Sequence, residues 1–90
     1  MKKIVVTVIG TDQVGIVSGV AKNLAEKNIN ILDISQTIMD DIFDMVLICD
    51  MEKANGTIKE IQDEMIKTGS DIGVDIRVQL ADVFYAMHRI

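Results

Sequence analysis

The sequence predicts an α+β fold in which a four-stranded antiparallel sheet carries two helices on one face. Apolar residues alternate at strand spacing and recur at helical spacing in the order βαββαβ, with a short helix at the end. The chain also contains 15 Ile and 10 Val but only 4 Leu, and β-branched residues favour strands. A length of 90 residues fits a single domain.

The first element is a strand, and a helix follows it. Residues 3–9 form an apolar, β-branched run. Apolar side chains then recur every three or four positions over residues 17–24, which predicts one buried face of a helix. Asp12 is the expected N-cap of this helix, and Asn28 is its expected end.

Two further strands follow, joined by a turn at residues 40–41. Residues 29–39 predict the second strand, whose alternation changes phase near Leu32 and Asp33. A β-bulge at that point would reconcile the two phases. Residues 43–51 predict the third strand, with apolar side chains on both faces.

The second half of the chain predicts a helix, a strand and a final short helix. Thr57 and Glu60 form a capping-box pattern at the start of the second helix, and Gly69 is its expected end. Residues 72–80 alternate cleanly and predict the fourth strand. Residues 80–90 predict an amphipathic helix.

These elements together predict a ferredoxin-like βαββαβ sandwich. The first and third strands are apolar on both faces and are expected at the centre, with the second and fourth at the edges. Residues 1–79 form the expected domain, and the helix over 80–90 is expected to pack on it or on a second subunit. A chain this short buries only about 60–65% of its unfolded surface, which favours a homo-oligomer.

Composition excludes several classes of function. Nine Lys and Arg against fourteen Asp and Glu give a net charge of −5, which disfavours binding to nucleic acid and to anionic membranes. The longest apolar stretches are about six residues, far below a membrane span. No signal peptide is visible, and the lone Cys49 can form neither an internal disulfide nor a structural zinc site. We therefore expect a reduced, cytoplasmic setting.

The glycine-bearing loop over residues 10–15 does not match a nucleotide-binding motif. It lacks the Gly-Lys-Ser/Thr of a phosphate loop, and Asp12 stands where a dinucleotide site needs glycine. The loop does lead into a helix N-terminus, where free N–H groups attract a carboxylate, and Gly15 leaves room for one. The alternative is a purely structural loop, in which Asp12 only caps the helix and Gly15 only packs against the sheet.

Polar residues at the start of the second strand could complete a site for a zwitterion. Asn30 and Asp33, together with Asp12, offer amide and carboxylate oxygens for an ammonium group. The plainer interpretation, a solvated strand entrance, stays open.

The remaining candidate groups favour structural roles. Asp40, Asp41 and Asp44 are more typical of a solvated turn than of a cation site. Cys49 lies on the core phase of its strand and is expected to be inert, and His88 has no adjacent nucleophile or metal ligand. We therefore expect no catalytic residues, no metal and no cofactor.

Two segments together resemble the ACT domain family: Gly-Thr-Asp-Gln-Val-Gly-Ile-Val over 10–17 and Asn-Ile-Asn-Ile-Leu-Asp-Ile-Ser-Gln over 28–36. In that family an Asp-x-x-Gly turn leads into the first helix, and an Asn-Ile-x-Asp stretch opens the second strand. The resemblance covers residues 1–79 and is greatest to small stand-alone ACT-domain proteins.

The resemblance implies a non-enzymatic regulatory protein that binds an amino acid or a similar small metabolite between paired domains. A homodimer and a regulated protein partner are implied with it. The loop from Asp12 to Ile16 would contact the backbone groups of the ligand. Asn30 and Ile31, from the same or the other subunit, would complete the pocket. The ligand-binding residues expected from the resemblance and from the polar pattern are Asp12, Gln13, Val14, Gly15, Ile16, Asn30, Ile31 and Asp33.

Two alternatives belong to other classes of function. An interaction module without a ligand would use its strand edges and the C-terminal helix to bind another protein. An enzyme is less favoured, because acylphosphatases of this fold class need an Arg in the first loop and residues 10–15 contain none. RNA-binding relatives need exposed aromatic residues on the central strands, which carry only Phe43.

Overall fold

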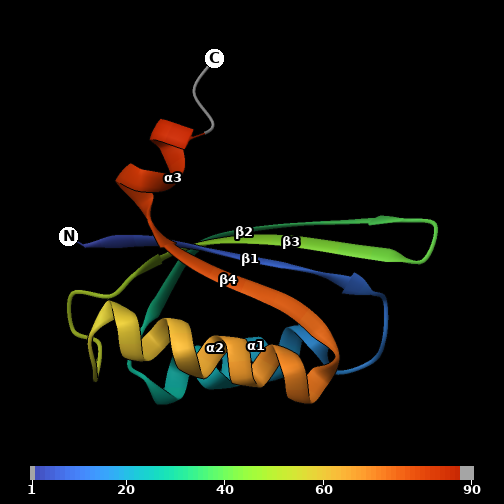
Figure 1. Ribbon diagram of the computed structural model, residues 1–90, viewed down its shortest axis with the longest axis horizontal. Helices are drawn as coiled ribbons and strands as arrows, with labels where there is room; N and C mark the ends of the chain where they lie inside the picture. Colours follow the sequence, from blue (N-terminus) through green and yellow to red (C-terminus); the bar gives the residue numbers. More distant parts are fainter. Residues whose placement is uncertain (1, 88–90) are drawn as a thin grey trace.

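The structure is a computed structural model that describes residues 2–87. Its strands form one antiparallel sheet in the order β2-β3-β1-β4, with α1 and α2 on one face and α3 on the other (Figure 1). The predicted ferredoxin-like class is confirmed, including the central place of the first and third strands. The elements are β1 (Lys3–Thr11), α1 (Ile16–Glu26), β2 (Asn30–Met39), β3 (Ile42–Asp50), α2 (Ile58–Ile72), β4 (Val74–Leu80) and α3 (Ala81–Met87).

The main core lies between the sheet and the two longer helices. Alternation along each strand turns every second side chain towards the helices, and helical spacing turns one face of each helix towards the sheet. All of these side chains are buried, which accounts for the strict apolar pattern of the sequence. They include Ile4, Val6 and Val8 of β1, Met45, Leu47 and Cys49 of β3, Val20 and Leu24 of α1, and Ile61 and Met65 of α2.

Strand β2 contains the predicted bulge. Ile31 pairs with Cys49, but the next paired residue of β2 is Asp33, opposite Ile48. Leu32 is therefore the extra residue, as the change of phase indicates. Because of the bulge, Ile31 and Ile34 both lie on the helix side of the sheet despite their odd spacing.

The start of α1 differs from the prediction. Its N-cap is Gly15, with φ +96°, and no side-chain hydrogen bond caps the helix. Asp12 lies too early in the loop to cap, and its backbone N–H instead donates to the Asp41 carbonyl at 2.8 Å. The prediction that Asp12 caps the helix is wrong, because the left-handed backbone at Gly15 makes the turn into it. Asn28 follows the helix end as expected, with φ +59°.

The end of α2 also differs from the prediction. The helix passes through Gly69 and ends at Gly73, whose N–H donates to the Gly69 carbonyl at 2.7 Å. Gly69 is buried where α2 approaches β4, and a Cβ there would lie 2.6 Å from the Val74 carbonyl oxygen. This glycine thus permits a close approach and does not end the helix, so Ile72 belongs to α2 and β4 begins at Val74.

Candidate functional site

The loop between β1 and α1 exposes the N-terminus of the helix. A Cβ built at Gly15 would meet no atom within 4 Å, and the Val14 side chain is fully exposed. Since no side chain caps α1, its first-turn N–H groups are open to an acceptor from outside. The loop is held against the end of α2, where the Gln13 side-chain amide donates to the Ile72 carbonyl at 2.8 Å. Ile16 anchors the helix start in the core.

The residues at the start of β2 lie at the opposite end of the sheet. Asn30 pairs with Asp50, and Asp50 pairs with Lys3 at the beginning of β1, whereas the loop follows Thr11 at its end. Eight strand steps separate Lys3 from Thr11, a distance of about 25 Å. One chain therefore does not bring Asp12 beside Asn30.

Asn30 lines a polar cavity of about 270 Å³ with Asn28, Asp50 and Lys53. The Asn28 side-chain amide donates to the Lys53 carbonyl at 2.8 Å and closes one wall. The cavity thus gathers amides, a carboxylate and an ammonium group, the groups that bind a zwitterion. Sequence reasoning missed Asp50 and Lys53, although the hairpin register places Asp50 opposite Asn30.

Ile31 and Asp33 lie next to this cavity along β2. Ile31 is half-buried against the core, and Asp33 is exposed. The Asp33 carboxylate accepts the backbone N–H of Ile34 at 2.9 Å. Asp33 therefore keeps lone pairs for a second donor.

Strand β2 is a long and unprotected edge. Nine of its ten residues are exposed, and only Ile31 is half-buried. Ile34 and Ile38 point to the helix side, yet they remain 45% and 56% exposed, whereas Ile31 of the same strand packs against the core. A bare edge with apolar side chains is a template for pairing with another strand.

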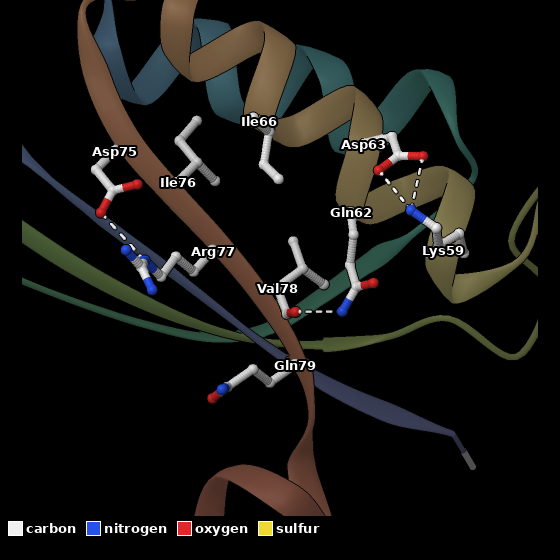
Figure 2. Close-up of a pocket in the computed structure, with 9 residues that line it drawn as sticks. All are labelled: Lys59, Gln62, Asp63, Ile66, Asp75, Ile76, Arg77, Val78 and Gln79. Carbon is white, nitrogen blue, oxygen red and sulfur yellow. Dashed lines mark hydrogen bonds and ion pairs between the residues drawn. The ribbon is translucent and has the colours of Figure 1, made fainter.

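Strand β4, the other edge, is protected by its own side chains and by α2 (Figure 2). The Gln62 side-chain amide donates to the Val78 carbonyl at 2.9 Å, which occupies an acceptor on the free edge. The Arg77 guanidinium pairs with the Asp75 carboxylate at 3.2 Å. These groups line a cavity of about 560 Å³ between α2 and β4. Capped acceptors and charges on a short strand disfavour edge-to-edge pairing.

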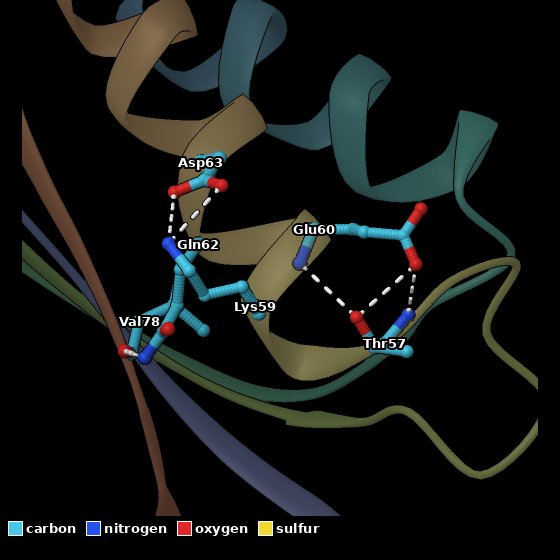
Figure 3. Close-up of polar contacts among 6 residues, drawn as sticks. All are labelled: Thr57, Lys59, Glu60, Gln62, Asp63 and Val78. Atoms are coloured by element: carbon cyan, nitrogen blue, oxygen red, sulfur yellow. Dashed lines mark hydrogen bonds and ion pairs between the residues drawn. The ribbon is translucent and has the colours of Figure 1, made fainter.

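The first turn of α2 is fixed by the predicted capping box (Figure 3). The Thr57 hydroxyl accepts the Glu60 backbone N–H at 3.3 Å, and the Glu60 carboxylate accepts the Thr57 N–H at 3.1 Å. Hydrogen bonds from the Thr57 backbone and hydroxyl hold the pKa of Glu60 below its usual value. This turn positions Gln62 over the β4 edge.

Replacing Thr57 with Ala should destabilise the protein by about 1 kcal/mol, because it removes the N-cap acceptor of α2. The stabilisation from Glu60 is present above its unfolded-state pKa of about 4.3 and is lost as the pH falls through the lower folded-state pKa. Urea unfolding of the parent, Thr57→Ala and Glu60→Gln between pH 3 and pH 7 checks both effects. A Glu60→Gln variant with the parent's pH dependence would refute the role assigned to this carboxylate.

Over residues 2–87, few groups are suited to catalysis or metal binding. Cys49 is buried, and burial raises the pKa of its thiol to about 11, so the thiol is protonated at neutral pH. Within residues 2–87, no group of three or more His, Cys, Asp or Glu could hold a metal ion. His88 lies outside the described residues.

None of the helices over 2–87 is long and apolar enough to cross a membrane.

Comparisons with known proteins agree with the fold and with the loop motifs. A sequence profile of the ACT domain matches residues 2–79. A UPF0237 protein of Methanocaldococcus jannaschii is 49% identical over 90 residues, which cover 100% of both chains.

Solved structures share the same fold. An ACT domain protein from Streptococcus pneumoniae superposes with a TM-score of 0.82 at 35% identity, covering 92% of this chain and 93% of that one. A formyltetrahydrofolate deformylase from Pseudomonas syringae pv. tomato superposes with a TM-score of 0.81 at 20% identity. That match covers 88% of this chain but only 27% of the deformylase, so it shows the fold alone. The chain belongs to the ACT domain family.

Proposed function

We propose that this protein is a non-enzymatic regulatory protein that binds an amino acid, or a similar small zwitterion, between two copies of the chain. The observation that carries the proposal is the open N-terminus of α1, whose first-turn N–H groups have no side-chain cap. Membership of the ACT family, whose domains are in general regulatory and ligand-binding, supports it. The lone buried thiol supports a cytoplasmic setting.

A homodimer through β2 would unite the two halves of the site. If two β2 strands pair antiparallel about a two-fold axis, the hairpin end of one strand lies beside the Asn30 end of the other. The loop over 12–16 adjoins the hairpin end, since the Asp12 N–H donates to the Asp41 carbonyl. Each loop would then face Asn30, Ile31 and Asp33 of the second copy.

The chemistry of the two halves suits the two ends of an amino acid. The N–H groups after Gly15 would donate hydrogen bonds to the ligand carboxylate, which the helix dipole also attracts. The Asn30 amide and the Asp33 carboxylate would accept hydrogen bonds from the ligand ammonium group. Asp50 and Lys53 would set the polarity of the adjoining cavity.

The bare β2 edge also favours a second candidate, an interaction module that binds another protein and no ligand. A screen for ligand-dependent stabilisation distinguishes the two candidates.

The test is a thermal-shift screen of the common amino acids on the parent and two loop variants. At ten times its Kd, a ligand should add about 1.4 kcal/mol and raise Tm by about 5–10 °C. Gly15→Asp should fold, because Asp tolerates a positive φ and is favourable at a helix N-terminus, but its charge should repel a ligand carboxylate and abolish the shift. Gly15→Asn, of the same shape without the charge, should keep part of the shift. No stabilisation of the parent by any amino acid at millimolar concentration would count against the proposal.

A further inference from the structure

A cavity of about 450 Å³, which we call the α3 cavity, lies where β1 begins and β4 passes into α3 (Figure 1). Ile4 pairs with Leu80, so the two residues before Ile4 run beside the first turn of α3. The Lys2 carbonyl accepts the Met51 N–H at 2.8 Å, which holds this part of the chain at the end of β3. Ala81 is buried and fixes the start of α3. The residues around the cavity are Lys2, Lys3, Leu80, Ala81, Asp82 and Tyr85.

The α3 cavity brings together charged groups that are not paired with one another. The ion pairs within residues 2–87 involve neither Lys2 nor Lys3 nor Asp82. Two ammonium groups and one carboxylate therefore remain available to a ligand. The ammonium groups can donate hydrogen bonds to a carboxylate, and the Asp82 carboxylate can accept them from an ammonium group.

The cavity also offers apolar surface. Leu80 is 37% exposed and Tyr85 is 50% exposed. Asp82 and Ala81 precede Tyr85 by three and four positions, so the three side chains share one face of α3. Apolar side chains with a few polar groups are the usual composition of a small-molecule site, and the volume is within the usual range of about 300–1,000 Å³.

We propose that the α3 cavity is a second ligand site, which binds an apolar amino acid within one chain. The ligand carboxylate would lie at Lys2 and Lys3, and its ammonium group at Asp82. Its side chain would pack against Leu80 and Tyr85. A zwitterion with an apolar side chain is the class of ligand that uses every kind of group around the cavity.

The α3 cavity is separate from the site proposed above. It shares no residue with the loop over 12–16 or with the cavity that Asn30 lines. α3 also lies beyond residues 2–79, the part of the chain that the ACT profile matches. Because the charged groups of the α3 cavity are exposed to water, we expect an affinity of about millimolar, so the cavity should contribute little to the thermal shifts.

Tyrosine fluorescence tests the proposal. The chain has one Tyr and no Trp, so the signal comes from Tyr85 in the α3 cavity. Leucine is the probe, and its analogues are 4-methylpentanoate, which lacks the ammonium group, and 3-methylbutylamine, which lacks the carboxylate. Leucine should change the fluorescence of the parent and of Gly15→Asp with the same Kd, which separates this test from the loop site. Each analogue should bind about tenfold more weakly.

Two sets of variants assign the charges. Lys2→Gln combined with Lys3→Gln should weaken leucine binding about tenfold. The matched control, Lys22→Gln combined with Lys67→Gln, removes two exposed lysines of α1 and α2 and should bind like the parent. Asp82→Asn should bind leucine and 4-methylpentanoate equally well. Circular dichroism should show that every variant is folded, since all of these residues are exposed.

No change in the fluorescence of the parent with leucine would overturn the proposal, and so would an equal loss of affinity in the control pair. Equal binding of leucine and 4-methylpentanoate by the parent would overturn the assignment to amino acids, because Asp82 would then not bind the ammonium group.

Discussion

Replacing Gly69 with Ala should destabilise the protein by about 2 kcal/mol or more, although Ala is the better helix former. The added Cβ would lie 2.6 Å from the Val74 carbonyl oxygen and 3.3 Å from the Ile76 backbone nitrogen. These are backbone atoms of β4, so α2 must lift from the sheet to make room. The shift would loosen the buried contacts of Met65 and Ile76 with their neighbours.

Gly19→Ala is the matched control, because Gly19 is also a helical glycine but lies where α1 meets Ile72 of α2 and not against a strand. A Cβ there would lie 2.8 Å from Ile72 Cδ1, the far end of a flexible side chain that can turn away. Since Ala is favoured over Gly in a helix by about 1 kcal/mol, this variant should be neutral or more stable. Urea unfolding of both variants gives the two free energies. Equal changes of the same sign would contradict the assignment of Gly69 to a close approach between α2 and β4.

Most of the fold could be predicted from the sequence because the core enforces periodicity. The alternation of β4 and the helical spacing of α1 exist because one face of each element must be apolar. The bulge at Leu32 was predictable for the same reason, since without it Ile31 and Ile34 would point to opposite faces of the sheet.

The roles of the glycines could not be predicted. Glycine serves equally for a positive φ, as at Gly15, and for a close approach, as at Gly69, and a single sequence does not distinguish the two. The two wrong predictions at helix ends, Asp12 as the cap of α1 and Gly69 as the end of α2, follow from this ambiguity. The free N–H groups at the start of α1 were expected from the sequence, but the absence of any side-chain cap was not.

The sequence offers Asp12 and Asn30 as candidate ligand-binding residues but does not say whether one chain can bring them together. However, α1 returns the chain to the end of the sheet where β1 begins, so Asn30 and Asp12 lie at opposite ends. A site that uses both therefore requires two chains. Asp50 was missed because only the pairing of β2 with β3 brings it to Asn30.

The proposed site between two chains predicts that two inactive variants restore binding when mixed. Gly15→Asp should remove the carboxylate half of the site, and Asn30→Ala should weaken the ammonium half, since Asn30 is exposed and its loss should leave the fold intact. A heterodimer of the two variants carries both changes in one site and neither in the other. An equal mixture that has exchanged subunits should therefore recover about one quarter of the parent's sites.

The most direct measurement is isothermal titration of the amino acid that stabilises the parent most, against each variant and against the mixture. Gly15→Asn mixed with Asn30→Ala is the control for the charge, and the parent gives the number of sites for comparison. The account predicts no measurable binding to Gly15→Asp, weak binding to Asn30→Ala, and about one quarter of the sites at the parent's Kd in the mixture. A mixture that binds no better than the average of its two components would contradict a site shared between two chains.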